Sequence, residues 1–184
     1  MEPGIMHAKT LRTLSDNELP ALRNKRKKNG IYFLLENIYD TYNIGALFRL
    51  ADAVGAEKLY LAGDMETPPN PKISNASIGT DRIVPWEYYK EPIEAIRSIK
   101  GLIPDITIVA VELHARAKLY TKINWKTPLL LIIGNETFGI TPKTLSSCQN
   151  IAVIPMYGVN KSLNVIVAAG IIAYWVLSQQ IYSR

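Results

Sequence analysis

Polar side chains that could do chemistry gather in three short stretches, and each stretch follows or borders an apolar run. The first contains Asn43 and Arg49, the second is Gly134-Asn135-Glu136, and the third ends with Ser162 and Asn164. A carboxylate can accept a proton, and a guanidinium can bind a phosphate or stabilise a developing oxyanion. If the fold brings the stretches together, they provide the groups for a ligand-binding site.

The sequence lacks the two commonest phosphate-binding patterns and any evident metal site. Neither G-x-G-x-x-G nor G-x-x-x-x-G-K-[ST] occurs. The single cysteine, Cys148, excludes a disulfide within the chain, and we interpret it as a small buried hydrophobe rather than a nucleophile. His7 and His114 have no metal-ligand spacing, so we expect no metal.

Apolar runs that alternate with helical patterns must position the three stretches. The strands are expected as continuous apolar runs, which is typical of parallel strands buried on both faces. The expected strands are residues 31–35, 58–61, 83–86, 106–111, 129–133 and 151–154. The expected helices are residues 44–54, 91–100, 142–148 and 165–177. Asn43 is expected to cap the first of these helices, and Ser162 or Asn164 the last. The pattern predicts an α/β fold: a mostly parallel sheet with helices on both faces.

Residues 62–85 are expected to form a long irregular segment, because Pro68, Pro69 and Pro71 fall in it. Within it, residues 74–80 are small and polar, which fits either close approach to a ligand or a short helix and turn. In open α/β sheets the ligand site lies beyond the carboxyl ends of the strands, where the three polar stretches are expected.

Residues 1–30 are expected to be a basic N-terminal extension, and residues 31–184 the main domain. Five cations fall between Arg23 and Lys28, which indicates either a solvated charge run or an arm that binds a polyanion. The net charge of +5 permits such a partner. No secretory signal is visible and the apolar run 165–177 is too short to span a bilayer, so a cytoplasmic protein without a membrane partner is expected.

Taken together, the three stretches resemble the SpoU (TrmH-like) branch of the SPOUT RNA methyltransferases. The first motif is matched by residues 43–49 (NIGALFR) with residues 51–55 (ADAVG), and the second by residues 131–139 (LIIGNETFG). The third is matched by residues 154–158 (IPMYG) with residues 162–165 (SLNV). The motifs occur in the right order, and the resemblance extends over residues 31–177.

The resemblance implies a deep trefoil knot in the C-terminal part, a homodimer, and S-adenosylmethionine held by the loops after three strands. It also implies that the apolar helix from Asn164 onward helps to fill the knot and the dimer contact. Carried over by position, the cofactor-binding residues are Glu112, Leu113, Ile133, Gly134, Asn135, Ile154, Met156 and Leu163.

The activity implied by the resemblance is methyl transfer to a ribose 2′-hydroxyl of RNA. Arg49 would orient a phosphate and stabilise the developing alkoxide, since a guanidinium normally stays protonated. Either Arg49 or Glu136 would handle the proton, and Glu136 could instead hold Arg49 in an ion pair. The remaining assignments are Asn43, Ser162 and Asn164 for positioning, and Lys25, Arg26, Lys27, Lys28 and Lys161 for RNA phosphates.

Two alternatives remain open at this point. The RNA could be transfer RNA, which the short basic extension favours slightly, or ribosomal RNA. The chain could also be a knotted RNA-binding protein without catalysis, but the joint presence of Asn43, Arg49, Glu136, Ser162 and Asn164 argues against it.

Overall fold

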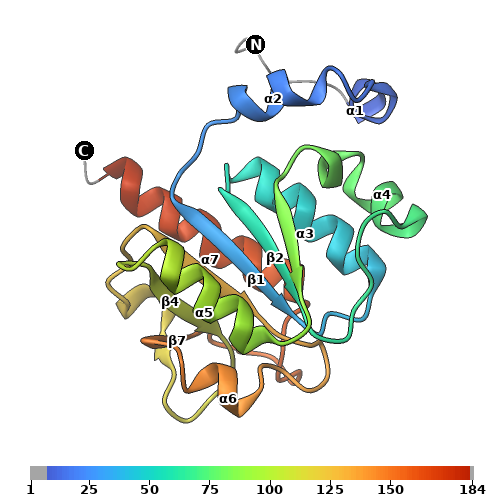
Figure 1. Ribbon diagram of the computed structural model, residues 1–184. Coiled ribbons are helices and arrows are strands. Elements are labelled where there is room, and N and C mark those ends of the chain that lie inside the picture. Colours follow the sequence, from blue (N-terminus) through green and yellow to red (C-terminus); the bar gives the residue numbers. More distant parts are fainter. Residues whose placement is uncertain (1–7, 183–184) are drawn as a thin grey trace.

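The computed structural model describes residues 8–182, which fold around a single seven-stranded sheet (Figure 1). Every pair of neighbouring strands is parallel, and the strand order is β3-β2-β1-β6-β4-β7-β5. The strands are β1 (Ile31–Glu36), β2 (Lys58–Ala62), β3 (Trp86–Tyr89), β4 (Thr107–Val111), β5 (Lys118–Leu119), β6 (Leu129–Ile133) and β7 (Asn150–Val153). The predicted parallel α/β sheet is therefore confirmed.

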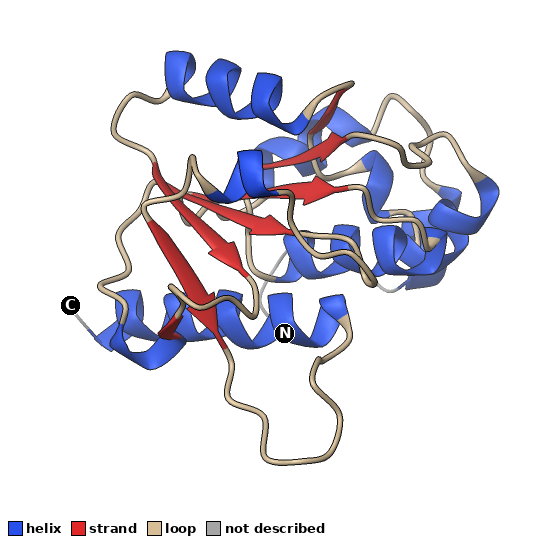
Figure 2. Ribbon diagram, turned by 90° about the horizontal axis from the view of Figure 1, so that it is seen from below, coloured by secondary structure: helices blue, strands red, loops and turns tan. Residues whose placement is uncertain are grey.

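Helices cover both faces of the sheet, as expected from strands without polar alternation (Figure 1, Figure 2). One face packs against α3 (Thr41–Ala53), α4 (Pro71–Ser77) and α7 (Val165–Tyr182). The other face packs against α5 (Pro92–Leu102) and α6 (Pro142–Leu145). The remaining elements are the helices α1 (Ala8–Thr13) and α2 (Leu19–Lys25) and the 3₁₀ turns η1 (Thr80–Arg82) and η2 (Tyr120–Lys122).

The start of α3 differs from the predicted one, and the difference matters for the site. Asp40, not Asn43, is the N-cap: its Oδ1 accepts a hydrogen bond from the backbone N–H of Tyr42 at 2.8 Å. The helix consequently begins at Thr41, and Asn43 lies inside its first turn with only 6% of its surface exposed. The Asn43 side chain is thus free to bind elsewhere.

Residues 62–85 contain more regular structure than predicted. Asn70 caps α4 by accepting hydrogen bonds from Lys72 N and Ile73 N, with Pro71 in the first turn. The helix packs closely on α3 at Gly45, where an added Cβ would lie 2.6 Å from the Ala76 Cβ. The glycine of the first motif therefore has a packing role.

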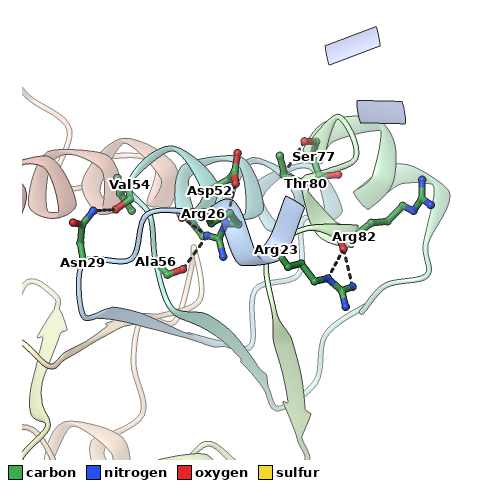
Figure 3. A network of polar contacts seen from close by, with 10 residues as sticks. Arg23, Arg26, Asn29, Asp52, Val54, Ala56, Ser77, Thr80 and Arg82 are labelled. Atoms are coloured by element: carbon green, nitrogen blue, oxygen red, sulfur yellow. Dashed lines mark hydrogen bonds and ion pairs between the residues drawn. The ribbon is translucent and has the colours of Figure 1, made fainter. Parts of the chain in front are cut away.

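The N-terminal extension is packed onto the domain rather than free. Leu14 and Leu19 are buried together with Ile83, and Arg23 donates two hydrogen bonds to the backbone oxygen of Arg82 (Figure 3). Arg26 donates to Asp52 Oδ1 at 3.1 Å and to Ala56 O at 2.9 Å, and its side chain is 8% exposed (Figure 3). The predicted RNA contact of Arg26 therefore does not fit, since its guanidinium already has buried partners.

Parallel strands place all their carboxyl ends at one edge of the sheet. The loops that leave β1, β4, β6 and β7 at this edge carry the three motifs or border them. The loop between β7 and α7 extends away from the sheet, and residues 157–162 in it are exposed (Figure 2). None of the helices within residues 8–182 has the length and hydropathy needed to cross a membrane.

Candidate functional site

A pocket of about 290 Å³ opens between the loops that follow β4, β6 and β7. This volume is near the lower end of the range of roughly 300–1,000 Å³ for ligand pockets. Apolar residues from the loops after β4 and β7 form part of its wall, including Leu113, Ile154 and Leu163. All eight residues predicted to bind the cofactor line it: Glu112, Leu113, Ile133, Gly134, Asn135, Ile154, Met156 and Leu163. We call it the loop pocket.

Three motif residues that lie far apart in the sequence are joined by side-chain hydrogen bonds at this edge. Asn43 Nδ2 donates to Glu136 Oε1 at 2.8 Å, and Asn164 Nδ2 donates to Asn43 Oδ1 at 3.3 Å. Asn164 also caps α7 by accepting a bond from Ile166 N at 2.8 Å, as one of the two predicted caps. The buried Asn43 thus links the second and third motifs through a single amide.

The second motif is a tight loop whose backbone is held from both sides. Asn135 and Gly139 exchange two backbone hydrogen bonds, and an added Cβ at Gly134 would lie 2.5 Å from the carbonyl carbon of Gly139. Glu112 Oε2 accepts from Ile140 N at 2.9 Å, and the buried Glu36 accepts from Thr141 N at 3.0 Å. Two carboxylates therefore fix consecutive amides where the loop ends.

Arg49 lies on α3, six residues after Asn43, and thus about 9 Å further along the helix axis. It is exposed and has no hydrogen-bond or ion-pair partner within residues 8–182, so the Glu136–Arg49 pair considered from the sequence is absent there. Glu136 is instead held by Asn43. The structure thus leaves the Arg49 guanidinium free to meet a partner outside this chain.

The remaining predicted residues differ in where they lie. Ser162 and Lys161 line the loop pocket and are exposed. Lys25 and Lys27 are exposed on the N-terminal extension, and Lys28 lies 3.5 Å from Glu57 in an exposed ion pair. The pocket therefore brings together the cofactor residues and the third motif, but not the cations of the extension.

Within residues 8–182, Cys148 and His114 show no sign of a catalytic or metal-binding role. Burial raises the pKa of the Cys148 thiol to about 12, and the nearby Glu36 carboxylate adds to the shift, so the thiol stays protonated at neutral pH. His7 lies outside the described residues. In the described part of the chain, no group of three or more His, Cys, Asp or Glu side chains is arranged to hold a metal.

Some site features were not predicted from the sequence. Thr137, Gly139, Val165 and Ala168 also line the loop pocket. The Glu112 carboxylate, expected at the cofactor, is bound by two backbone amides, those of Leu113 and Ile140. The sequence did show that Glu112 is a polar residue directly after the buried strand β4. It did not show that Glu112 binds the amide of Ile140, 28 residues away.

A second, larger cavity of about 550 Å³ lies on the other side of the edge, between the ends of β1, β2 and β3 and helices α5 and α6. Tyr88, Lys90, Ile93 and Lys143 are among its lining residues, and no residue of the three motifs lines it. Size therefore does not identify the functional pocket, since the chemistry-bearing residues surround the smaller one.

The fold and the site define a parallel α/β protein that binds a small ligand between loops at the carboxyl edge of its sheet. Residues 30–174 match the model of the SpoU rRNA Methylase family. The chain is 32% identical over 166 residues to the tRNA (guanosine(18)-2'-O)-methyltransferase of Aquifex aeolicus, covering 87% of this chain and 76% of that protein. It is 26% identical to the 23S rRNA (guanosine-2'-O-)-methyltransferase RlmB of Vibrio parahaemolyticus, over 98% of this chain and 71% of the relative.

Solved structures agree with the sequence comparisons. The SpoU methyltransferase AviRb from Streptomyces viridochromogenes matches with a TM-score of 0.77 and 29% identity, over 88% of this chain and 64% of AviRb. AviRb has also been solved in complex with AdoMet. The A. aeolicus TrmH/SpoU tRNA modifying enzyme matches with a TM-score of 0.75 and 27% identity, over 96% of this chain and 86% of that one.

The chain therefore belongs to the SpoU rRNA Methylase family, and the resemblance inferred from the three motifs is confirmed. It spans less than two thirds of AviRb, so part of that protein has no counterpart in the match.

Proposed function

We propose that this protein transfers the methyl group of S-adenosylmethionine to a ribose 2′-hydroxyl of RNA, with transfer RNA as the favoured substrate. The observation that supports this most strongly is the convergence of three motifs at one pocket through the Asn43–Glu136 and Asn43–Asn164 hydrogen bonds. Similarity to transfer-RNA and ribosomal-RNA 2′-O-methyltransferases supports the reaction, and the 32% identity to a transfer-RNA enzyme supports the substrate.

The loop pocket fits S-adenosylmethionine by the chemistry of its wall. Ile133, Ile154 and Leu163 offer an apolar slot for an adenine ring, and the backbone groups of the same loops can bond its edge. The AdoMet complex of AviRb supports the same class of cofactor here. The cofactor, when bound, supplies an electrophilic methyl group, so the protein must position the hydroxyl and manage its proton.

Glu136 is the proposed proton acceptor. Two carboxylates line the loop pocket, but Glu112 uses one oxygen for Leu113 N and the other for Ile140 N. Glu136 is exposed at the pocket, and Asn43 holds its Oε1. A carboxylate that is oriented by a buried amide and open to solvent can take a proton from a bound hydroxyl.

Arg49 is proposed to bind the phosphate beside the target ribose and to stabilise the developing alkoxide. Ser162 and Lys161, exposed at the pocket, are proposed to contact the same nucleotide, and Asn43 and Asn164 position the loops. Arg49 has no partner within residues 8–182, which supports action on RNA or across a subunit boundary.

A homodimer and a C-terminal knot are part of the proposal. Tyr42 on α3 is 63% exposed, and Val167 and Tyr174 on α7 are 48% and 54% exposed. Since α3 and α7 pack against each other, these side chains are candidates for a subunit contact. The knot is supported by the strand order, because β7 lies between β4 and β5, which come earlier in the chain. Because the proposed substrate is a cellular RNA, we also propose a cytoplasmic location.

The direct test is methyl transfer from labelled S-adenosylmethionine to transcribed transfer RNA, followed by digestion to nucleosides. We expect one 2′-O-methylated nucleoside and no label in a DNA of the same sequence, which lacks the accepting hydroxyl. Label on a base would contradict the assigned reaction. A folded protein that binds cofactor and RNA without transfer to transfer or ribosomal RNA would favour the RNA-binding alternative.

A further inference from the structure

The net positive charge of the chain comes entirely from its C-terminal part. Residues 1–105 contain 14 Lys and Arg and 14 Asp and Glu, so they are balanced in spite of the basic run at 23–28. Residues 106–184 contain seven Lys and Arg against two Asp and Glu, which accounts for the whole net charge of +5. The electrostatic attraction for a polyanion is therefore centred on the half that contains the loop pocket.

Four of these cations lie in one segment, residues 113–126, which we call the edge segment because it includes the edge strand β5. Arg116, Lys118, Lys122 and Lys126 are exposed, and none of them has an ion-pair partner within the described chain. The segment itself contains no Asp or Glu. Its charge is thus available to an external anion.

Among the described residues, neither acidic group of the same half forms an ion pair with the edge segment. Glu112 is bonded to the amides of Leu113 and Ile140, and Glu136 is bonded to Asn43. By contrast, the N-terminal cations are partly neutralised: Arg26 pairs with Asp52, and Lys28 pairs with Glu57. The edge segment therefore keeps four cations without an ion-pair partner in the described chain, whereas two of the five cations of the N-terminal run are paired.

The edge segment borders the loop pocket. In the sheet, Lys118 lies beside Ala152 and Leu119 beside Val153, and both of these β7 residues line the pocket. Leu113, at the start of the segment, lines it as well. Arg116 and Lys118 therefore lie at the end of the segment that borders the pocket. Lys126 lies at the other end, because its neighbour Thr127 packs against Gly30 at the amino end of β1.

The edge segment is also held in place, so its cations sit on a fixed surface. The Tyr120 ring meets the Trp175 ring of α7 edge-on at 5.4 Å, and Trp125 Nε1 donates to Tyr120 O at 2.9 Å. Cations on an ordered scaffold lose less conformational freedom when they bind a phosphate.

The N-terminal basic run, in comparison, lies at the amino ends of the strands, because it leads into the start of the inner strand β1. Asn29 N donates to Gly55 O, and Arg26 pairs with Asp52 near the end of α3. The 13-residue α3 separates that end from the motif edge by about 20 Å. In its own subunit, this run is therefore remote from the loop pocket.

We propose that the edge segment, through Arg116, Lys118 and Lys122, is the principal surface on which this protein binds the phosphodiester backbone of its RNA. The N-terminal run contributes little. This inference rests on the proposed function, because it takes RNA as the substrate, and it names the surface that the substrate uses.

Two matched triple variants test the proposal, since each removes three exposed lysine or arginine charges. One carries Arg116→Gln, Lys118→Gln and Lys122→Gln, and the other carries Lys25→Gln, Lys27→Gln and Lys28→Gln. Affinity for a transcribed transfer RNA is measured between roughly 50 and 200 mM salt, where phosphate contacts determine the slope of log K against log salt. Calorimetry with S-adenosylmethionine checks that each variant keeps its pocket.

We expect the edge variant to bind RNA at least about tenfold more weakly at low salt, with a slope smaller by about 2, since each lost contact removes roughly 0.7–0.9. The N-terminal variant should stay close to the unmodified protein. The reverse result, a full slope in the edge variant and a reduced one in the N-terminal variant, would overturn the assignment and leave the proposed function intact.

Two further outcomes are distinguishable. An unmodified protein that binds no RNA in a salt-dependent way contradicts the proposed function and this surface with it. If the edge variant does not fold, the single variants Arg116→Gln and Lys118→Gln decide, because each should reduce the slope by about 0.7–0.9. An unchanged slope in both would overturn the proposal.

Discussion

Two clusters of polar side chains in this protein are built alike but serve different ends. The first joins Ser74, Ser77 and Asp81 through hydrogen bonds between residues four to seven apart in the sequence. The second joins Asn43, Glu136 and Asn164 across separations of 93 and 121 residues. The local cluster stabilises one turn between α4 and η1, whereas the long-range cluster holds three loops around a pocket.

Burial separates the two clusters as well. Ser77 is fully buried and Asp81 is 5% exposed, so their polar groups depend on each other. Glu136 and Asn164 are exposed, with the buried Asn43 between them. Loss of a residue should therefore reduce stability in the first cluster and activity in the second.

The largest expected effect comes from Arg49→Ala, since Arg49 shares α3 with Asn43 but has no partner within residues 8–182. We expect methyl transfer to fall by at least about 10²–10³-fold, the usual cost of removing one transition-state stabiliser. The free energy of unfolding should change by less than about 0.5 kcal/mol. Single-turnover kinetics and urea unfolding measure the two quantities, and loss of cofactor binding in a folded variant would contradict this role.

Asn43→Ala should lower the rate by about 10–100-fold, because a carboxylate released by its orienting group is misplaced for proton transfer. It should also destabilise the protein by only about 1 kcal/mol, the value of a typical hydrogen bond. The matched control is Asn17→Ala, an exposed amide outside the cluster. Equal rates for the two variants would show that the long-range cluster is not needed for transfer.

Asp81→Ala should act on stability, since it removes the carboxylate that accepts hydrogen bonds from both Ser74 and the buried Ser77, and leaves the Ser77 hydroxyl only the backbone oxygen of Ser74 at 3.1 Å. We expect a loss of about 2–4 kcal/mol in the free energy of unfolding. The rate per folded molecule should stay near that of the unmodified protein. Asp105→Ala, at an exposed position, is the control and should lie within about 0.5 kcal/mol. If Asp81→Ala lowered the rate per folded molecule without reducing the free energy of unfolding, the two clusters would not differ in role as described.

Cys148→Ala should have the smallest effect on transfer, because the thiol lies in neither cluster. Since burial raises the pKa of the Cys148 thiol to about 12, a thiol reagent at pH 8.5 should react slowly with the folded protein and quickly after unfolding in urea. The native state holds this proton more tightly, so ionisation should lower stability as the pH rises above the unfolded pKa of about 8.5. Rapid labelling of the folded chain would contradict this.

The sheet was largely predictable from the sequence because buried parallel strands are continuous apolar runs. Residues 129–133 were predicted as a strand and form β6 with the same bounds. β5 was missed, since Lys118 and Leu119 form a two-residue edge strand that is exposed and has no apolar pattern. α4 was considered only as one alternative, a short helix and turn within residues 74–80. Its start at Pro71 was missed because the prolines of residues 62–85 favoured an irregular chain, although Asn70 and Pro71 are a normal helix start.

The residues of the site were predictable from three motifs, but their contacts were not. Glu136 was considered as a partner of Arg49, and it is bound by Asn43 instead, because Asp40 caps the helix and leaves the Asn43 amide free. Arg26 was grouped with its neighbours as an RNA contact, yet its buried guanidinium bonds Asp52 and backbone oxygens. Sequence spacing shows which chemical groups are present, but partners more than 20 residues apart depend on the fold.

The most direct test of the account is calorimetric titration with S-adenosylmethionine of two variants that each place an indole in one cavity. Met156→Trp fills the loop pocket, and Ile93→Trp fills the larger cavity beside α5. The account predicts that one site per chain is lost in Met156→Trp and kept in Ile93→Trp, with both variants folded. Binding that survives in Met156→Trp but is lost in Ile93→Trp would contradict it.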